Sequence, residues 1–291
     1  RMVKIYAAVF AALIIPVAAQ VPVLDGAKPE EVVGGFKFLE GPARAPNGDL
    51  YFVDKNAHRI LHWRIAEQKL REVTAESKAA NGMQFDHRGR LIACQGQARS
   101  VVAFDPESGK VAEVLAARFE GKVFNNPNDL WIHPRGDIYF TDPAYKNTGK
   151  HELDTRQAYR IATDGAITRV TEGFNTPNGI VGTPDGKTLY VTDRRLNRTW
   201  RYAIQSDGSL AGKQLHCKVG ADGMTLDELG NLYTTPNKPE IRVFKPDGSE
   251  LGTIPMPKPA SNLCFAGVDG KTLFITTHKT LYQLKMKVTG Q

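Results

Sequence analysis

Six polar residues share one position relative to a recurring glycine turn, and together their side chains could bind a metal ion. Each stands eight residues before the turn glycine, and all six are Asn, Asp or Glu, which are depleted in β-strands. Oxygen ligands without histidine or cysteine suit Ca²⁺ best, with Mg²⁺, Mn²⁺ or Zn²⁺ as alternatives. The two carboxylates would balance the charge of one divalent cation. The six are Glu40, Asn81, Asn128, Asn178, Asp222 and Asn262.

The same residue types also cap strands and satisfy the backbone of turns, which is the alternative explanation for any one of them. Six of six at a single register favours a common structural role. That role depends on the elements that carry the six residues.

The turns repeat along the chain and indicate a β-propeller. A glycine turn followed by a β-rich run occurs six times, and successive turn glycines are 40 to 50 residues apart. Each repeat has room for four short strands, which is the pattern of a propeller blade. Helical periodicity is nearly absent after the N-terminal segment. We therefore predict an all-β, six-bladed propeller, built on the segments at 46–54, 87–95, 134–142, 184–193, 228–236 and 268–277.

The sixth repeat ends after its third strand, so its sheet lacks a fourth. The segment EVVGGFKF, residues 31–38, is predicted to supply that strand and close the ring, which removes two exposed sheet edges. The first strand of each blade lines the central channel, so equivalent positions form a ring about the axis. The six polar side chains are therefore predicted to meet in the channel.

The N-terminus has the features of an export signal. Lys4 precedes an apolar stretch over residues 5–19, and the small residues Val17 and Ala19 fit cleavage after Ala19. About 15 apolar residues are too few for a stable membrane span, which needs about 20. We expect a signal peptide over 1–19, one propeller domain over 20–291 and an exported protein, periplasmic or secreted. An uncleaved anchor is the alternative.

Composition argues against several other classes. The net charge of +7 arises from 38 Lys and Arg spread among 31 Asp and Glu, without a run of like charges that would favour nucleic acid. The three cysteines, Cys94, Cys217 and Cys264, form no C-x-x-C pair that would indicate zinc or redox chemistry. The chain also lacks a nucleophile elbow, a phosphate-binding loop and a dinucleotide fingerprint.

The segments around the six positions closely resemble the gluconolactonase-like family, which includes senescence marker protein (regucalcin). The resemblance covers roughly residues 30–285 and includes EGPARAPNGDLYF, NNPNDLWIHPRGDIYFTDPAY, TPNGIVGTPDGKTLYVTD and ADGMTLDELGNLY. It implies a six-bladed propeller with one divalent-metal centre that hydrolyses lactones, chiefly sugar lactones such as gluconolactone. More distantly, the chain resembles diisopropyl-fluorophosphatase and the paraoxonases.

Carried over residue by residue, the resemblance implies four metal ligands, which are four of the six positions found from the repeat. They are Glu40 of E-G-P, Asn128 of N-D, Asn178 of P-N-G and Asp222 of D-G-M. Asn126 stands where some relatives carry an arginine that contacts sugar hydroxyls.

These residues predict a metal-dependent lactonase in which a polarised lactone carbonyl is attacked by water. Asp222 is the candidate general base, acting directly or by positioning the water. The residues expected to contact substrate hydroxyls are Asn81, Asn126, Tyr145 and Asn262. A non-catalytic propeller that binds a sugar or a partner, with a structural metal, is one alternative, and phosphotriester hydrolysis on the same metal is another. The oligomeric state and the particular lactone stay open.

Overall fold

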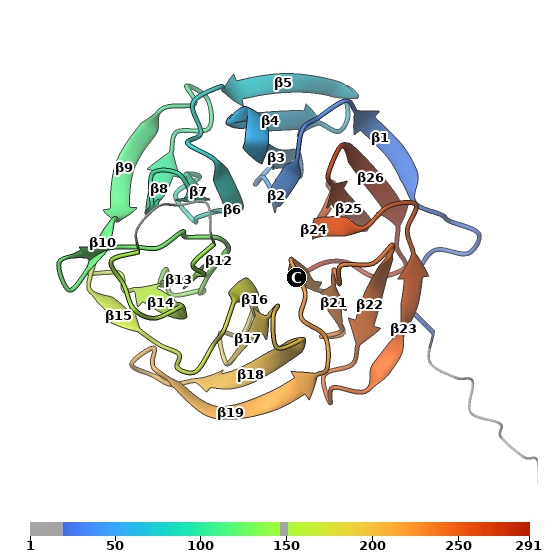
Figure 1. Cartoon of the computed structure of the whole chain (residues 1–291). Helices are drawn as coiled ribbons and strands as arrows, with labels where there is room; N and C mark the ends of the chain where they lie inside the picture. The colour runs from blue at the N-terminus through green and yellow to red at the C-terminus, as the bar shows by residue number, and fades with distance from the viewer. Residues whose placement is uncertain (1–19, 146–150) are drawn as a thin grey trace, which may run out of the picture.

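Six four-stranded antiparallel sheets surround a central axis in the computed structural model, which describes residues 20–145 and 151–291 (Figure 1). The strands of each blade follow one another from the axis outward. The predicted six-bladed propeller is therefore confirmed. The predicted signal peptide, residues 1–19, lies outside the described residues.

The first three blades occupy the N-terminal half of the ring. The first contains β2 (Leu39–Arg44), β3 (Leu50–Asp54), β4 (Arg59–Arg64) and β5 (Lys69–Thr74), with the 3-10 helix η1 (Lys55–Ala57) after β3. The second contains β6 (Ala80–Phe85), β7 (Leu91–Gln95), β8 (Ser100–Phe104) and β9 (Val111–Ala116). The third contains β12 (Leu130–Ile132), β13 (Ile138–Asp142), β14 (Gln157–Ile161) and β15 (Ile167–Arg169). A small hairpin, β10 (Arg118–Phe119) and β11 (Lys122–Val123), precedes this third blade.

The other three blades complete the ring. The fourth contains β16 (Pro177–Gly182), β17 (Thr188–Asp193), β18 (Arg198–Ile204) and β19 (Leu210–Cys217). The fifth contains β20 (Met224–Leu226), β21 (Leu232–Thr234), β22 (Glu240–Phe244) and β23 (Glu250–Pro255). The sixth contains β24 (Ala260–Ala266), β25 (Thr272–Thr277) and β26 (Thr280–Lys285). All six turn glycines have a positive φ, which such turns require.

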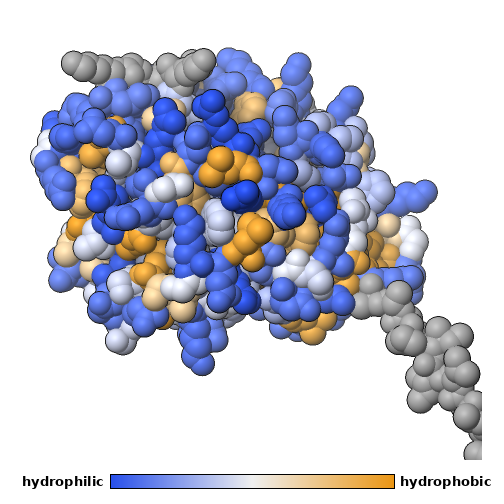
Figure 2. All heavy atoms as spheres, turned by 60° about the horizontal axis from the view of Figure 1, so that its bottom comes forward, coloured by the Kyte–Doolittle hydropathy of each residue, from blue (hydrophilic) through white to orange (hydrophobic). Residues whose placement is uncertain are grey.

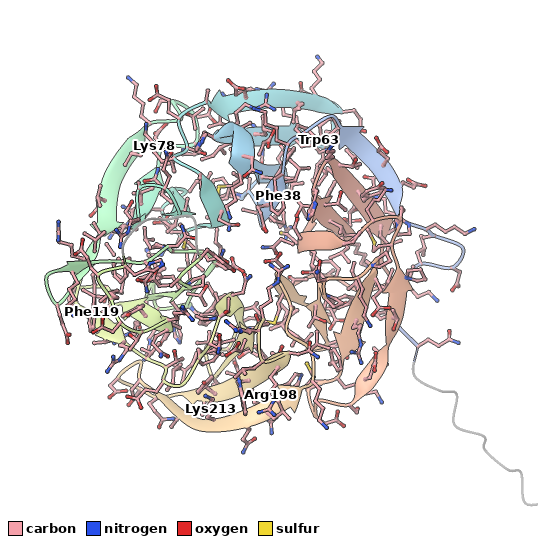
Figure 3. The ribbon with its side chains drawn as sticks, viewed as in Figure 1. Phe38, Trp63, Lys78, Phe119, Arg198 and Lys213 are labelled. Carbon is pink, nitrogen blue, oxygen red and sulfur yellow. The ribbon has the colours of Figure 1, made fainter. Side chains whose placement is uncertain are left out.

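The N-terminal strand β1 (Glu30–Gly34) closes the ring by pairing antiparallel with β26. The predicted closure is confirmed, although the strand is shorter than the predicted 31–38. It ends at Gly34 because Gly35 adopts a φ of 91°, outside the strand region. Residues 36–38 then lead into the first blade, and Phe38 lies close to the central opening (Figure 3).

The apolar core lies between neighbouring blades. One cluster joins the second and third blades through Cys94, Val101, Phe140 and Tyr159, none of which retains solvent exposure. The rings of Phe140 and Tyr159 stack with their centroids 5.6 Å apart. Because each blade buries apolar side chains against its neighbours, the blades stabilise one another.

The outer surface is mixed. The face in Figure 2 is largely hydrophilic, with apolar residues scattered over it.

Cys94, Cys217 and Cys264 are free thiols. Over residues 20–145 and 151–291, the structure contains no helix with the length and apolar character needed to cross a bilayer.

Buried aspartates at the ends of three second strands hold the loops that enter the channel. Asp193 is fully buried, and its carboxylate accepts hydrogen bonds from the backbone N–H groups of Asn175 (2.7 Å), Thr176 (3.2 Å) and Leu196 (3.1 Å). Asp54 and Asp142 accept equivalent bonds from the loops before β2 and β12. These carboxylates therefore fix the approach of the first strands to the axis.

Replacing Asp193 with alanine should destabilise the protein, because three backbone N–H groups lose their acceptor. We expect the free energy of unfolding to fall by about 3 kcal/mol, which lowers the Tm by about 6–12 °C for a domain of this size. Thermal unfolding followed by circular dichroism measures the change. Asp164→Ala is the control, since Asp164 is exposed and accepts one bond within its own turn. A loss below about 1 kcal/mol for Asp193→Ala would contradict the anchoring role.

Candidate metal centre

The strands distort where the six predicted ring positions occur. Asn128 and Asp222 lie just before β12 and β20, outside regular pairing. Bulges and strand ends release a side chain from the alternation of a sheet and re-aim it, so the distortions explain how polar side chains can turn toward the axis. Register shifts accompany the other four positions, between Glu40 and Ala43, Ala80 and Met83, Pro177 and Ile180, and Ala260 and Asn262.

Glycines beside the ring residues let neighbouring blades approach closely. A Cβ added to Gly41 would lie 1.8 Å from the carbonyl oxygen of Asn81, and one added to Gly223 would lie 2.1 Å from Oδ1 of Asn262. Each glycine therefore packs against the ring residue of the next blade. This contact explains the E-G and D-G pairs in the sequence, because any side chain there would push the ring residues apart.

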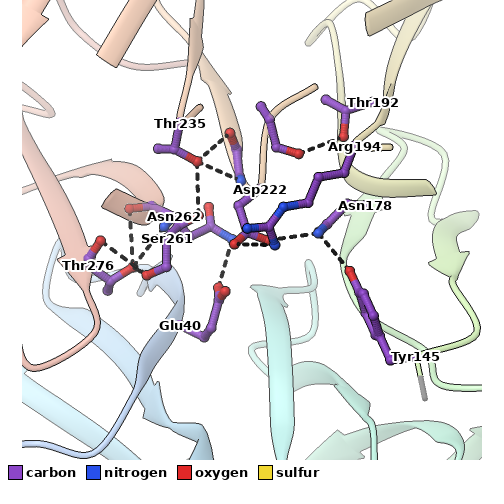
Figure 4. A network of polar contacts seen from close by, with 12 residues as sticks. Glu40, Tyr145, Asn178, Thr192, Arg194, Asp222, Thr235, Ser261, Asn262 and Thr276 are labelled. Atoms are coloured by element: carbon purple, nitrogen blue, oxygen red, sulfur yellow. Dashed lines mark hydrogen bonds and ion pairs between the residues drawn. The ribbon is translucent and has the colours of Figure 1, made fainter. Parts of the chain in front are cut away.

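Hydroxyl groups join the third blade to the fourth, the fourth to the fifth, the fifth to the sixth and the sixth to the first at the level of the ring. They come from the ends of three second strands and from Ser261, and each donates to a backbone carbonyl beside or within the ring. Figure 4 labels Thr192, Thr235 and Ser261 among these donors. The bonds fix the backbone at the candidate site without using its side chains. They are Thr141 Oγ1 to Asn178 O (2.7 Å), Thr192 Oγ1 to Ala221 O (2.9 Å), Thr235 Oγ1 to Ser261 O (2.9 Å) and Ser261 Oγ to Leu39 O (2.7 Å).

Asp222 is the centre of a polar network in the channel (Figure 4). Its Oδ1 accepts a hydrogen bond from Asn178 Nδ2 at 2.8 Å, and its Oδ2 lies 3.0 Å from Arg194 Nη1 in an ion pair. The Asn178 amide also donates to the hydroxyl of Tyr145 at 2.8 Å. Predicted ligands and a predicted substrate contact thus lie in one network, together with an arginine that the sequence did not indicate.

Glu40 lies on the first blade and contacts the sixth. Its Oε2 accepts bonds from Gly41 N at 3.2 Å and from Asn262 Nδ2 at 3.4 Å. Burial, together with the negative charge of Asp222, raises the pKa of Glu40 well above its ordinary value. Burial also raises the pKa of Asp222, although Arg194 opposes the shift. The two carboxyl groups are therefore close enough for their charges to repel.

A cavity of about 530 Å³ opens at this end of the channel. It is lined by Glu40, Asn128 and Asp222 of the predicted ligands and by Asn81, Asn126 and Tyr145 of the predicted substrate contacts. Asn126 is held in place by its Nδ2, which donates to Gly96 O at 2.9 Å. Asn178 reaches the cavity through its bonds to Tyr145 and Asp222.

Asn262 has a different place from the other predicted substrate contacts. It lines a second cavity, of about 400 Å³, at the opposite end of the channel, together with Asp129, Trp131, Cys264 and the C-terminal Gln291. Its Oδ1 accepts from Leu263 N at 2.8 Å, and its Nδ2 points to Glu40. In this geometry Asn262 donates a hydrogen bond to Glu40 from the side of the second cavity and does not face the channel mouth.

The donor set fits a hard divalent cation. The buried carboxylate of Glu40, the partly buried carboxylate of Asp222 and two asparagine amides would supply only oxygen ligands, and burial raises the pKa of both acids. The Asn178 amide turns its nitrogen to Asp222, and rotation of the amide by half a turn would offer its Oδ1 to a cation. Among the described residues no group of three or more His, Cys, Asp or Glu could hold a metal, and the proposed set contains only two acids.

Two cations at the mouth, Lys55 and Arg194, were not found from the sequence. Each directly follows the aspartate that ends its second strand, in the pairs Asp54-Lys55 and Asp193-Arg194. Both line the cavity of the candidate site. The signal was present in the sequence, because the two Asp-cation pairs end corresponding strands of the first and fourth blades.

Comparison with known proteins places the chain in a family. Residues 38–279 match the model for the SMP-30/Gluconolactonase/LRE-like region. A gluconolactonase of Zymomonas mobilis is 30% identical over 307 residues, covering 92% of this chain and 84% of that protein. Diisopropyl-fluorophosphatase of Loligo vulgaris is 27% identical over 271 residues, covering 82% and 85%.

A solved structure supports the same grouping. The gluconolactonase XC5397 of Xanthomonas campestris superposes with a TM-score of 0.84 at 29% identity, covering 91% of both chains. The chain therefore belongs to the SMP-30/gluconolactonase/LRE-like family of six-bladed propellers.

Proposed function

We propose that this protein is a lactonase that depends on a divalent cation, Ca²⁺ in the first instance, and acts on sugar lactones. The observation that carries the proposal is the meeting of Glu40, Asn128 and Asp222 in one cavity beside Asn178. The gluconolactonases among its relatives support the reaction class.

Glu40, Asn128, Asn178 and Asp222 would hold the cation through their side-chain oxygens. When bound there, a divalent cation supplies a Lewis acid that polarises the ester carbonyl of a lactone. Glu40 serves as a ligand with Asn262 fixing its position. Asn178 is oriented by the Tyr145 hydroxyl. These contacts hold the donor atoms before substrate arrives, which limits the rearrangement that binding requires.

In this proposal Asp222 accepts or orients the proton of the attacking water. Water adds its oxygen to the carbonyl carbon, the carboxylate of Asp222 accepts or orients a water proton, and the ring C–O bond breaks. The leaving ring oxygen takes a proton and becomes the hydroxyl of the product hydroxy acid. Asn81, Asn126 and Tyr145 line the cavity wall, where their polar groups can bond to sugar hydroxyls.

A pH-indicator assay with five- and six-membered sugar lactones tests the reaction class, because each turnover releases a hydroxy acid. We expect lactone hydrolysis with Ca²⁺ and at least tenfold weaker turnover of a phosphotriester. If the protein binds the cation but hydrolyses no lactone, the result would favour a non-catalytic propeller that binds a sugar or a partner. Turnover of the phosphotriester alone would favour a phosphotriester hydrolase.

Export with cleavage after Ala19 stays a prediction, which N-terminal sequencing of the protein from its native cells tests.

A further inference from the structure

We propose that the preferred lactone carries an anionic oxygen group, a carboxylate or a phosphate, which Lys55 and Arg194 bind at the channel mouth. This inference rests on the proposed function and names the substrate class of the same site. Four charged side chains of the described chain line the cavity, two acids and two bases: Glu40, Asp222, Lys55 and Arg194.

The charges in the cavity would not balance around a neutral substrate. A divalent cation held by Glu40 and Asp222 cancels their two negative charges. The ammonium of Lys55 and the guanidinium of Arg194 then keep two positive charges without a counterion among the residues that line the cavity. A partly enclosed site with surplus positive charge favours an anionic ligand, because the low-dielectric walls strengthen the attraction.

Arg194 is the better placed of the two cations. Its guanidinium already lies 3.0 Å from Asp222 Oδ2, and its side chain is only 36% exposed. Asp193, anchored by three backbone N–H groups, fixes the backbone beside it. A cation that takes the oxygens of Asp222 leaves the guanidinium to bind another group. Its planar fork matches a carboxylate or a phosphate.

Lys55 lines the cavity from the first blade and Arg194 from the fourth, and these two blades lie on opposite sides of the axis (Figure 1). The Lys55 backbone N–H donates to Phe38 O at 2.8 Å, which fixes the start of its side chain. No salt bridge involving Lys55 occurs within residues 20–145 and 151–291. An anionic group at the mouth would give this ammonium a partner too.

Two matched pairs of lactones test the proposal and separate its two sources of charge. Galactono-1,4-lactone and galactaro-1,4-lactone share a ring and differ in a terminal alcohol or carboxylate. Glucono-1,5-lactone and its 6-phosphate differ in the phosphate. For the wild-type protein with Ca²⁺, we expect kcat/KM to be about tenfold or more higher for the anionic member of at least one pair. The pair with the larger ratio identifies the group.

Lys55→Gln and Arg194→Gln should each lower that ratio by about tenfold, mainly through KM. The ratio is the readout because Arg194 also contacts Asp222, so its loss can lower turnover of both lactones. Arg195→Gln is the matched control, because Arg195 is the exposed neighbour and does not line the cavity. Calorimetry with the ring-opened diacid and the ring-opened monoacid gives a readout independent of turnover. Wild type should bind the diacid more tightly, and Arg194→Gln should lose the difference.

Two outcomes would overturn the inference. One is a wild-type ratio near one for both pairs together with normal lactone hydrolysis. The other is an equal loss for anionic and neutral lactones in Arg194→Gln, which would assign the arginine to the reacting centre. Absence of all lactone turnover would instead refute the proposed function, and the calorimetric comparison would still decide whether the mouth prefers an anion.

Discussion

Asp222→Ala should lower kcat/KM for a sugar lactone by at least about 10³-fold and leave the propeller folded. The change removes a ligand and the candidate base together, and the base alone contributes about 10²–10⁴-fold in typical enzymes. It also leaves Arg194 without the carboxylate that it contacts at 3.0 Å. Steady-state assays with saturating Ca²⁺ measure the loss, and circular dichroism checks the fold.

Asp222→Asn separates the two roles of this residue. The amide keeps an oxygen that can bind a cation and loses the ability to accept a proton at neutral pH. We expect the cation to bind more weakly and turnover to stay depressed by about 10²-fold or more even when the site is saturated. Asp247→Asn, in an exposed turn, is the control and should be unchanged. Full activity with bound cation in Asp222→Asn would remove the base role.

Glu40→Gln should affect binding of the cation far more than the chemical step. Glu40 is buried and lines the cavity, and its contacts with Gly41 N and Asn262 fix its position, so we expect it to act as a ligand and not as a base. We expect affinity for Ca²⁺ to fall by about 10²-fold, whereas kcat at saturating Ca²⁺ stays within about tenfold of wild type. Calorimetric titration measures the affinity.

The same variant changes how Ca²⁺ affects stability. A ligand that binds only the folded state raises stability by RT ln(1 + [L]/Kd), about 4 kcal/mol at a thousandfold excess over Kd. The Tm of wild type should therefore rise with Ca²⁺, and Glu40→Gln should need about a hundredfold more Ca²⁺ for the same rise. Equal responses of the two proteins would show that Glu40 is not a ligand.

The repeat in the sequence was enough to predict the blades and the level of the ring. Turn glycines with positive φ and β-rich runs determine local hairpins, so Gly48 and its counterparts could be read without tertiary information. Closure by the N-terminal strand followed from a missing fourth strand, and the pairing of β1 with β26 confirms it. The end of β1 at Gly34 depended on one backbone angle that no pattern contained.

The directions of side chains around the ring could not be predicted in the same way. A common register places Asn262 level with Glu40, yet the bulge in β24 and the bond to Leu263 N turn it toward the opposite cavity. The approach of Arg194 to Asp222 joins residues from different blades, and such contacts depend on packing that a single blade does not encode. The hydrogen bonds from Thr141 and Thr192 to backbone carbonyls also join neighbouring blades, so the sequence of one blade does not predict them.

Long-wavelength X-ray data from a crystal soaked in Ca²⁺ test the central claim most directly, because the anomalous signal locates the ion itself. We predict one axial peak at 2.3–2.6 Å, the usual Ca²⁺–oxygen distance, from side-chain oxygens of Glu40, Asn128, Asn178 and Asp222. A peak away from these four residues, or none in crystals of protein whose activity requires Ca²⁺, would contradict the account.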